Sequence, residues 1–181
     1  HGDFGIGTVN GLNGEMVALD GVFYQIPVDG VPRQIGSGEK TPYATVTFFE
    51  ADQTSHVADA LNYSELTEYI SGILPSENAI YAIKVHGTYD YAKTQSVPLQ
   101  MQPYQPLTEA IKNQTVFTLS NVAATAVGFW FPSSMDGVDF AGYHLHLITD
   151  SHSGGGHLLD CILRDATVEI DQTRKFMMIL P

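Results

Sequence analysis

The sequence predicts an α+β fold: a strand-rich, two-lobed protein with a mixed sheet and one long helix, followed by a mainly antiparallel β lobe. Short β-branched and aromatic runs with period-two alternation recur along the chain, and Gly, Pro and Asp separate them. Only two stretches have helical spacing of their apolar residues. The 181 residues, 44% of them hydrophobic, suffice for one sizeable core or two small lobes that share one.

The first two strands are predicted at residues 16–19 and 22–26. They flank Asp20-Gly21, a dipeptide that suits a type I′ hairpin turn because both central residues need positive φ. Residues 28–40 have Gly, Pro and charge without periodicity and are interpreted as a surface loop. The later predicted strands are residues 43–49, 79–86, 96–101, 115–119, 126–131, 142–148, 157–163, 167–170 and 176–180.

The long helix is predicted over residues 55–73, where Val57, Leu61, Leu66, Ile70 and Ile73 recur at roughly helical spacing. A shorter helix is predicted around residues 107–112. The polar, proline-bearing stretch 102–106 suggests a boundary between an N-terminal mixed lobe, residues 1–105, and a mainly β lobe, residues 106–181, within one compact unit.

Charge excludes several classes of partner. Eight Lys+Arg against 20 Asp+Glu give 8 − 20 = −12. Nucleic-acid binding needs a basic surface, and an anionic membrane is disfavoured for the same reason. No apolar run approaches the roughly 20 residues that span a bilayer. The single cysteine, Cys161, cannot form an intrachain disulfide, and its apolar strand predicts a buried thiol.

Three histidines are the strongest chemical signal. In GYHLHLI, residues 142–148, strand alternation puts His144 and His146 on one face and the leucines on the other. His157 follows a Gly-, Ser- and Asp-rich stretch, residues 150–156, whose composition is typical of a hairpin. A return strand there would bring His157 beside the pair. Three neutral imidazoles with one open position suit Zn²⁺ or a similar divalent ion.

Simpler interpretations exist for each histidine and for one carboxylate. An HxH pair alone is a weak signal, because strands often carry two exposed histidines. His86 is expected in the core or supporting a metal ligand, His152 in solvent, and His56 at the start of the long helix. Glu15 follows Gly14 at a strand start, where it is either an exposed glutamate or a proton carrier that reaches a site.

Several motifs together resemble the acetolactate decarboxylase family. No GxSxG, Walker or GxGxxG pattern competes with this interpretation. The matching segments run in family order over nearly the whole chain, and their combination is specific although no single piece is. They are residues 7–16, 20–25, 41–49 (TPYATVTFF), 81–89 (YAIKVHGTY), 96–104 (SVPLQMQPY), 127–131 (VGFWF), 142–148 (GYHLHLI) and 155–160 (GGHLLD).

The resemblance implies a site and a reaction. His144, His146 and His157 would be the Zn²⁺ ligands, Glu15 the active-site glutamate near the metal, and Thr8 a residue lining the pocket. The family's reaction is non-oxidative decarboxylation of 2-acetolactate, a small-molecule substrate, to acetoin and carbon dioxide, with enantioselective protonation. The implied assembly is a homodimer formed through sheet edges.

Two departures from the family pattern set the alternatives. Family members place an arginine that holds the substrate carboxylate where this sequence has Gln95, which lacks the charge and the bidentate fork. Lys93 and Arg164 are the candidate substitutes. Family chains also continue past a segment like residues 176–181 into a tail with another active-site glutamate, which this sequence does not include. The alternatives are a zinc-binding relative acting on another hydroxy-keto acid and a non-catalytic homologue.

Overall fold

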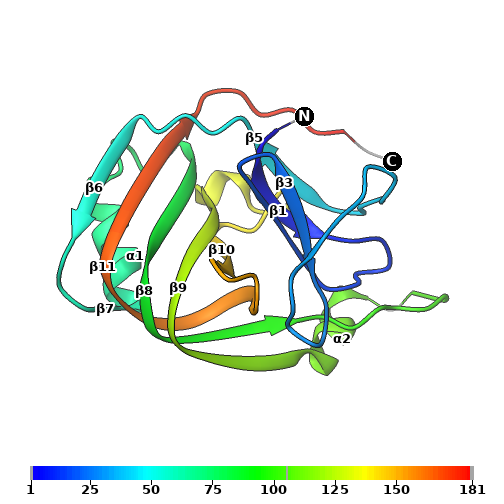
Figure 1. Cartoon of the computed structure of the whole chain (residues 1–181). Coiled ribbons are helices and arrows are strands. Elements are labelled where there is room, and N and C mark those ends of the chain that lie inside the picture. Colours follow the sequence, from blue (N-terminus) through cyan, green and yellow to red (C-terminus); the bar gives the residue numbers. More distant parts are fainter. Residues whose placement is uncertain (1, 105, 180–181) are drawn as a thin grey trace.

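A computed structural model describes residues 2–104 and 106–179, and its strands form two antiparallel sheets (Figure 1). The first sheet has the order β4-β3-β2-β1-β5. Asp20 and Gly21, between β2 and β3, both have positive φ, which confirms the predicted tight hairpin. The strands of the first sheet are β1 (Phe4–Thr8), β2 (Glu15–Leu19), β3 (Val22–Ile26), β4 (Arg33–Gln34) and β5 (Ala44–Thr47).

The second sheet contains the longest strands and has the order β10-β9-β8-β11-β6. In addition, β10 pairs with β11, so β10, β9, β8 and β11 form a closed ring, and the short β7 pairs with β11. Its strands are β6 (Gln53–Val57), β7 (Leu61–Asn62), β8 (Ile80–Ser96), β9 (Thr115–Phe131), β10 (Gly142–Thr149) and β11 (Gly155–Thr173).

Two apolar layers lie on opposite sides of the second sheet. On one side, Leu66 and Ile70 of helix α1 (Tyr63–Ile73) pack against side chains of the sheet that include Leu145 and Leu147. On the other, Phe4 and other residues of the first sheet pack against the second sheet. The arrangement is therefore helix, sheet, sheet (Figure 1). His146 of the second sheet and Glu15 of the first approach each other between the two sheets.

The α+β class is confirmed, but several strand bounds are wrong. Of residues 79–86, all but Ala79 belong to one 17-residue strand, β8, which runs on to Ser96. The pairs 115–119 with 126–131 and 157–163 with 167–170 are likewise single strands, β9 and β11. The sequence predicted breaks at polar residues that the structure accommodates inside the strands: Asn121 and Asp165 have positive φ, and the β8–β11 register shifts in three places.

The long helix is shorter than predicted. Residues 53–57 form β6 against β11, so His56 lies on a strand and does not open a helix. The helix begins at Tyr63 because Asn62 and Glu65 form a capping box: the Glu65 N–H donates to Asn62 Oδ1 at 3.0 Å and the Asn62 N–H to Glu65 Oε2 at 2.8 Å. It ends before Leu74-Pro75, as expected next to a proline.

Of the remaining predicted elements, the short helix is confirmed and two strands are wrong. The short helix appears as α2 (Leu107–Ala110) and a 3₁₀ turn (Ile111–Asn113), and a second 3₁₀ turn spans Ser133–Met135. Residues 97–101 and 176–179 are irregular, against expectation, while Leu180 lies outside the described residues. The boundary near residue 105 stays a prediction; β8, before it, pairs with β9 and β11 after it. No described helix has the length and apolar character to cross a membrane.

Candidate metal centre

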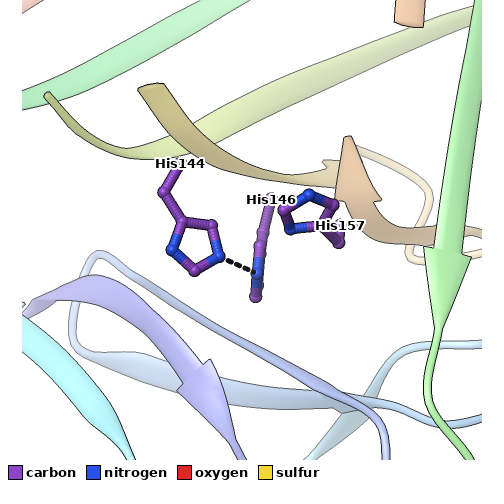
Figure 2. Close-up of side chains that lie close together, drawn as sticks. All are labelled: His144, His146 and His157. Carbon is purple, nitrogen blue, oxygen red and sulfur yellow. Dashed lines mark hydrogen bonds between the residues drawn. The ribbon is translucent and has the colours of Figure 1, made fainter. Parts of the chain in front are cut away.

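The predicted histidine cluster forms on the β10–β11 hairpin. His146 pairs directly with His157 across the two strands, and His144 lies two residues before His146 on the same face. Leu145 and Leu147 point into the opposite apolar layer, as the alternation predicted. Figure 2 shows the three imidazoles projecting from this hairpin toward the N-terminal strands. Their ring centroids lie 5.1–5.4 Å apart.

The ring nitrogens converge as a cation requires. One ligand nitrogen from each ring lies within 4.8 Å of the others, and the Nε2 atoms of His144 and His146 are 3.3 Å apart. A tetrahedral ion with metal–nitrogen bonds of about 2.0–2.1 Å has its ligand atoms about 3.3 Å apart. Two ring nitrogens that face each other at this distance need a proton or a cation between them. The three histidines therefore fit a divalent metal ion.

A hydrogen bond orients one of the ligands. His146 Nδ1 lies 2.9 Å from the carbonyl oxygen of Met16 on β2. Because a carbonyl only accepts, Nδ1 carries the proton, and Nε2 of the neutral ring keeps its lone pair toward the cluster. His144 differs: its Nδ1 is buried and has no hydrogen-bond partner among the described residues.

Burial keeps the three rings neutral. Removal from water lowers the pKa of His144 to about 4, and removal from water together with the neighbouring His144 lowers that of His157 to about 4. The pKa of His146, the most deeply buried ring, lies well below its usual value for the same reasons. Neutral imidazoles are the form that binds a metal, so the rings are free of competing protons near neutral pH.

Glu15 and Thr8 complete the cluster from the first sheet. The two residues pair across β2 and β1, and Glu15 Oε2 lies 3.4 Å from His146 Nε2. Burial raises the pKa of the Glu15 carboxyl to about 8, although a backbone hydrogen bond from Val97 opposes the shift. The Thr8 hydroxyl donates to the Gly14 carbonyl at 2.6 Å. Glu15 is therefore buried beside the histidines, and the interpretation as an exposed glutamate is wrong.

Gln95 lies in the same row of the second sheet as the histidines. It pairs with His157, which pairs with His146, and residues directly opposite each other share a face. Its Oε1 is buried without a hydrogen-bond partner among the described residues. Arg164 and Lys93 were the candidate substitutes for the family arginine. The Arg164 Nε–H donates to Asp90 Oδ1 at 3.0 Å on the surface. Lys93 lies two residues before Gln95 within β8, and its side chain is exposed.

The other singled-out residues lie away from the cluster. His86 is exposed, with Nε2 3.1 Å from Asp150 Oδ2, so its expected place in the core or behind a ligand is wrong. His152 is exposed, as predicted, and stacks on Tyr24. Cys161 is buried, and burial raises the pKa of its thiol to about 12.

The whole chain, residues 1–181, matches the family model for alpha-acetolactate decarboxylase. This protein belongs to the alpha-acetolactate decarboxylase family. It is 49% identical over 181 residues to an alpha-acetolactate decarboxylase from Methanosarcina mazei, of which it spans 63%, and 39% identical to one from Bacillus subtilis, of which it spans 71%. Those relatives are, as their name states, decarboxylases and hence carboxy-lyases.

Solved structures agree with the assignment to the alpha-acetolactate decarboxylase family. The crystal structure of acetolactate decarboxylase from Bacillus subtilis subspecies spizizenii superposes with a TM-score of 0.97 at 40% identity, over all of this chain and 78% of that one. A Staphylococcus aureus protein of unknown function, described as similar to alpha-acetolactate decarboxylase, gives 0.93 at 32% identity, over 96% of this chain and 75% of that one.

Three residues around His144 in this alpha-acetolactate decarboxylase family member carry no clear signal in the sequence. The ring of Tyr43, from the loop before β5, lies 6.4 Å from that of His144, and the ring of Phe140 lies 5.3 Å from it, edge-on. The Asp139 carboxylate accepts hydrogen bonds from Tyr43 and Thr45, at 2.8 Å each. The only sequence signal was proximity: Asp139 and Phe140 precede the histidine strand, and Tyr43 lies in the TPYATVTFF motif.

Proposed function

We propose that this protein decarboxylates 2-acetolactate to acetoin and carbon dioxide, with a zinc ion held by His144, His146 and His157. The observation that carries the proposal is the convergence of three buried or largely buried imidazoles beside the buried Glu15, within a chain of this family. When bound there, a divalent cation supplies Lewis-acid stabilisation of the negative charge that builds up as carbon dioxide leaves.

We assign to Glu15 the role of proton donor after decarboxylation. Decarboxylation breaks the bond between the carboxylate carbon and the substrate's central carbon, and the electron pair stays on the hydroxy-keto fragment. A proton must then be added to that carbon to give acetoin. Glu15 is a carboxyl buried against the histidines and fixed by its place in β2, so it presents its proton from one side. Delivery from a single fixed position would favour one enantiomer of acetoin.

Thr8 and Gln95 are assigned to substrate binding. Thr8 stands opposite Glu15 in the neighbouring strand, with its hydroxyl proton directed to Gly14, so its oxygen is left to accept a hydrogen bond. Gln95 stands opposite His157, where its side-chain amide can donate to the substrate carboxylate. A neutral amide holds a carboxylate more weakly than an arginine does.

Gln95 also supports a second candidate, a hydroxy-keto acid other than 2-acetolactate. The buried Gln95 oxygen without a partner is a free acceptor, which suits a substrate that presents a donor, such as a hydroxyl group, at this position. Such an enzyme would bind the metal and form no acetoin. Homodimer formation, expected from the family, is a separate proposal that light scattering of the purified protein tests.

The test of function is acetoin formation from racemic 2-acetolactate by the zinc-loaded protein. We expect metal-dependent acetoin formation by the wild type. His146→Ala should lower this activity more than about 100-fold, because the loss of a metal ligand costs more activity than the loss of a residue that only supports a ligand. His86→Ala, which changes an exposed histidine, should keep full activity.

Three results would contradict the proposal in different ways. Zinc bound without acetoin would favour the second candidate, and the Gln95→Arg variant would then show whether a charged carboxylate anchor restores the reaction. No zinc by elemental analysis would overturn the ligand assignment. Equal activity in wild type and His146→Ala would overturn the role of the triad.

A further inference from the structure

The histidines of the candidate site are not held in the same way. His146 donates to the Met16 carbonyl, which fixes the plane of its ring. The His144 Nδ1 is buried without a partner among the described residues, so no hydrogen bond there fixes its ring. Ligating histidines usually gain their orientation from such a bond. Something else must hold His144 in position.

Apart from its Nε2 atom, which faces His146 Nε2 at 3.3 Å within the triad, the His144 ring packs against two aromatic rings. The Phe140 ring meets the His144 ring edge-on at 5.3 Å, with an interplanar angle of 85°. The Tyr43 ring lies nearly parallel to that of His144, with centroids 6.4 Å apart, and Phe140 is also edge-on to Tyr43. His144 is only 9% exposed although Phe140 itself is 55% exposed, so these rings shield the histidine from solvent.

One carboxylate holds both aromatic residues. Asp139 Oδ1 accepts from the Tyr43 hydroxyl at 2.8 Å and from the Phe140 N–H at 2.7 Å, while Asp139 Oδ2 accepts from the Thr45 hydroxyl at 2.8 Å. Thr45 belongs to β5 of the first sheet, and Asp139 belongs to the segment that leads into β10 of the second. The carboxylate therefore ties residues 136–141 to the opposite sheet, directly beside His144.

We propose that Asp139 is a positioning residue for the metal site: through Tyr43, Thr45 and Phe140 it fixes the ring of His144 and keeps bulk water from that side of the triad. The inference rests on the proposed metal site and adds to it a support outside the ligand set. Loss of the support leaves all three ligands in place, but it frees one ring to turn and admits water beside it.

The test uses Co²⁺ as the probe, because its visible absorption reports the number and arrangement of its ligands. The variants are Asp139→Asn and Tyr43→Phe, which keep size and remove hydrogen bonds, and Phe140→Ala, which removes the ring. Asp136→Asn is the matched control, since it removes the same charge from an exposed acid of the same segment. Thermal unfolding of each metal-free variant shows that it is folded.

We expect Phe140→Ala to release Co²⁺ to excess chelator about tenfold faster than the wild type, the usual scale for losing a group that supports a ligand. Asp139→Asn and Tyr43→Phe should release it roughly threefold faster, by the same reasoning for a partial loss. All three should have weaker visible bands, as expected when water joins the coordination sphere. Asp136→Asn should match the wild type.

Hydrogen exchange of the metal-free protein tests the hydrogen bonds of Asp139 independently of metal binding. The amides of residues 138–144 should exchange faster in Asp139→Asn and Tyr43→Phe than in Asp136→Asn. Unchanged exchange, or release rates and spectra equal to those of the control, would overturn this proposal alone. A wild-type protein that takes up no Co²⁺ would overturn the metal site and this inference with it.

Discussion

The two faces of β10 are buried to the same degree but are built for different purposes. Leu145 and Leu147 are 1% and 0% exposed and pack in the layer under α1, while His146, between them, is 1% exposed and faces the first sheet. On the leucine side, burial is favourable because apolar surface leaves water. On the histidine side, burial pushes pKa values away from their usual range and leaves His144 Nδ1 without a partner among the described residues. Equal burial thus stabilises the fold on one face and prepares a ligand site on the other.

The largest expected change in the free energy of unfolding comes from Leu147→Ala, on the leucine face. Truncating a fully buried leucine should lower the free energy of unfolding by about 2–5 kcal/mol, measured in urea, while the stoichiometry of bound metal stays the same. Leu147→Met, which keeps the volume, should cost less than about 1.5 kcal/mol. If Leu147→Ala lost its metal while still folded, the two faces would not be independent.

The pH dependence of the metal-free protein should come from the histidine face. The histidine pKa values are lowered on folding, so the unfolded chain binds more protons below pH 6.5, and stability falls as the pH drops toward 4. The Glu15 pKa is raised from 4.5 to about 8, so its contribution is full below pH 4.5 and is lost as the pH rises through 8. Stability should therefore be greatest near pH 6.5.

Urea unfolding in the presence of chelator measures this profile. We expect the Glu15 contribution, taken as the difference between the wild type and Glu15→Gln, to fall by about 1.6 kcal/mol between pH 6.5 and pH 8, because the folded carboxyl loses only part of its proton over that interval. Glu15→Gln should flatten this alkaline side and leave the acid side, whereas Leu147→Ala should lower the whole curve without changing its shape. An alkaline decrease that persists in Glu15→Gln would assign it to another group.

The smallest effect is expected from the helix that covers the leucine face. Asn62→Ala removes the side chain that caps α1 and should cost about 1 kcal/mol of unfolding free energy. Metal content and the shape of the pH profile should stay the same. Ser64→Ala, in the first turn of the same helix, is the control. A cost equal to that of the control would show that the capping box contributes little here.

The sequence predicted the histidine cluster better than it predicted the strands, for a physical reason. The alternation in GYHLHLI and the Gly-rich stretch after it are local, and together they define which residues share a face and where the chain turns back. Glu15 and Gln95 come from distant strands, and their places came from the family resemblance. Tyr43 and Asp139 were missed because the hydrogen bonds of Asp139 with Tyr43 and Thr45 link segments 94–96 residues apart, which no local pattern encodes. Phe140 lies only four residues before His144, but in an irregular segment with no periodicity to show which way its ring points.

Two of the strand errors, the splitting of β9 and of β11, share one cause. Polar residues such as Asn121 and Asp165 are typical of turns, so the sequence favoured several short strands. In the structure they adopt positive φ within long strands, which continue on both sides. The helix was extended too far because Val57 and Leu61 have helical spacing, although residues 53–57 find a partner in β11. Tertiary pairing decided both cases.

The hairpin that joins β10 and β11 also bears on how the protein folds. His146 and His157 meet after a short loop is closed, whereas His146 and Met16 are 130 residues apart. Local contacts of the first kind form early in folding, and distant ones of the second kind form late. A metal ion captured by the hairpin would therefore find its three protein ligands before the first sheet docks. It would act as a template on which the rest of the site is assembled, and the Glu15 carboxyl would arrive last.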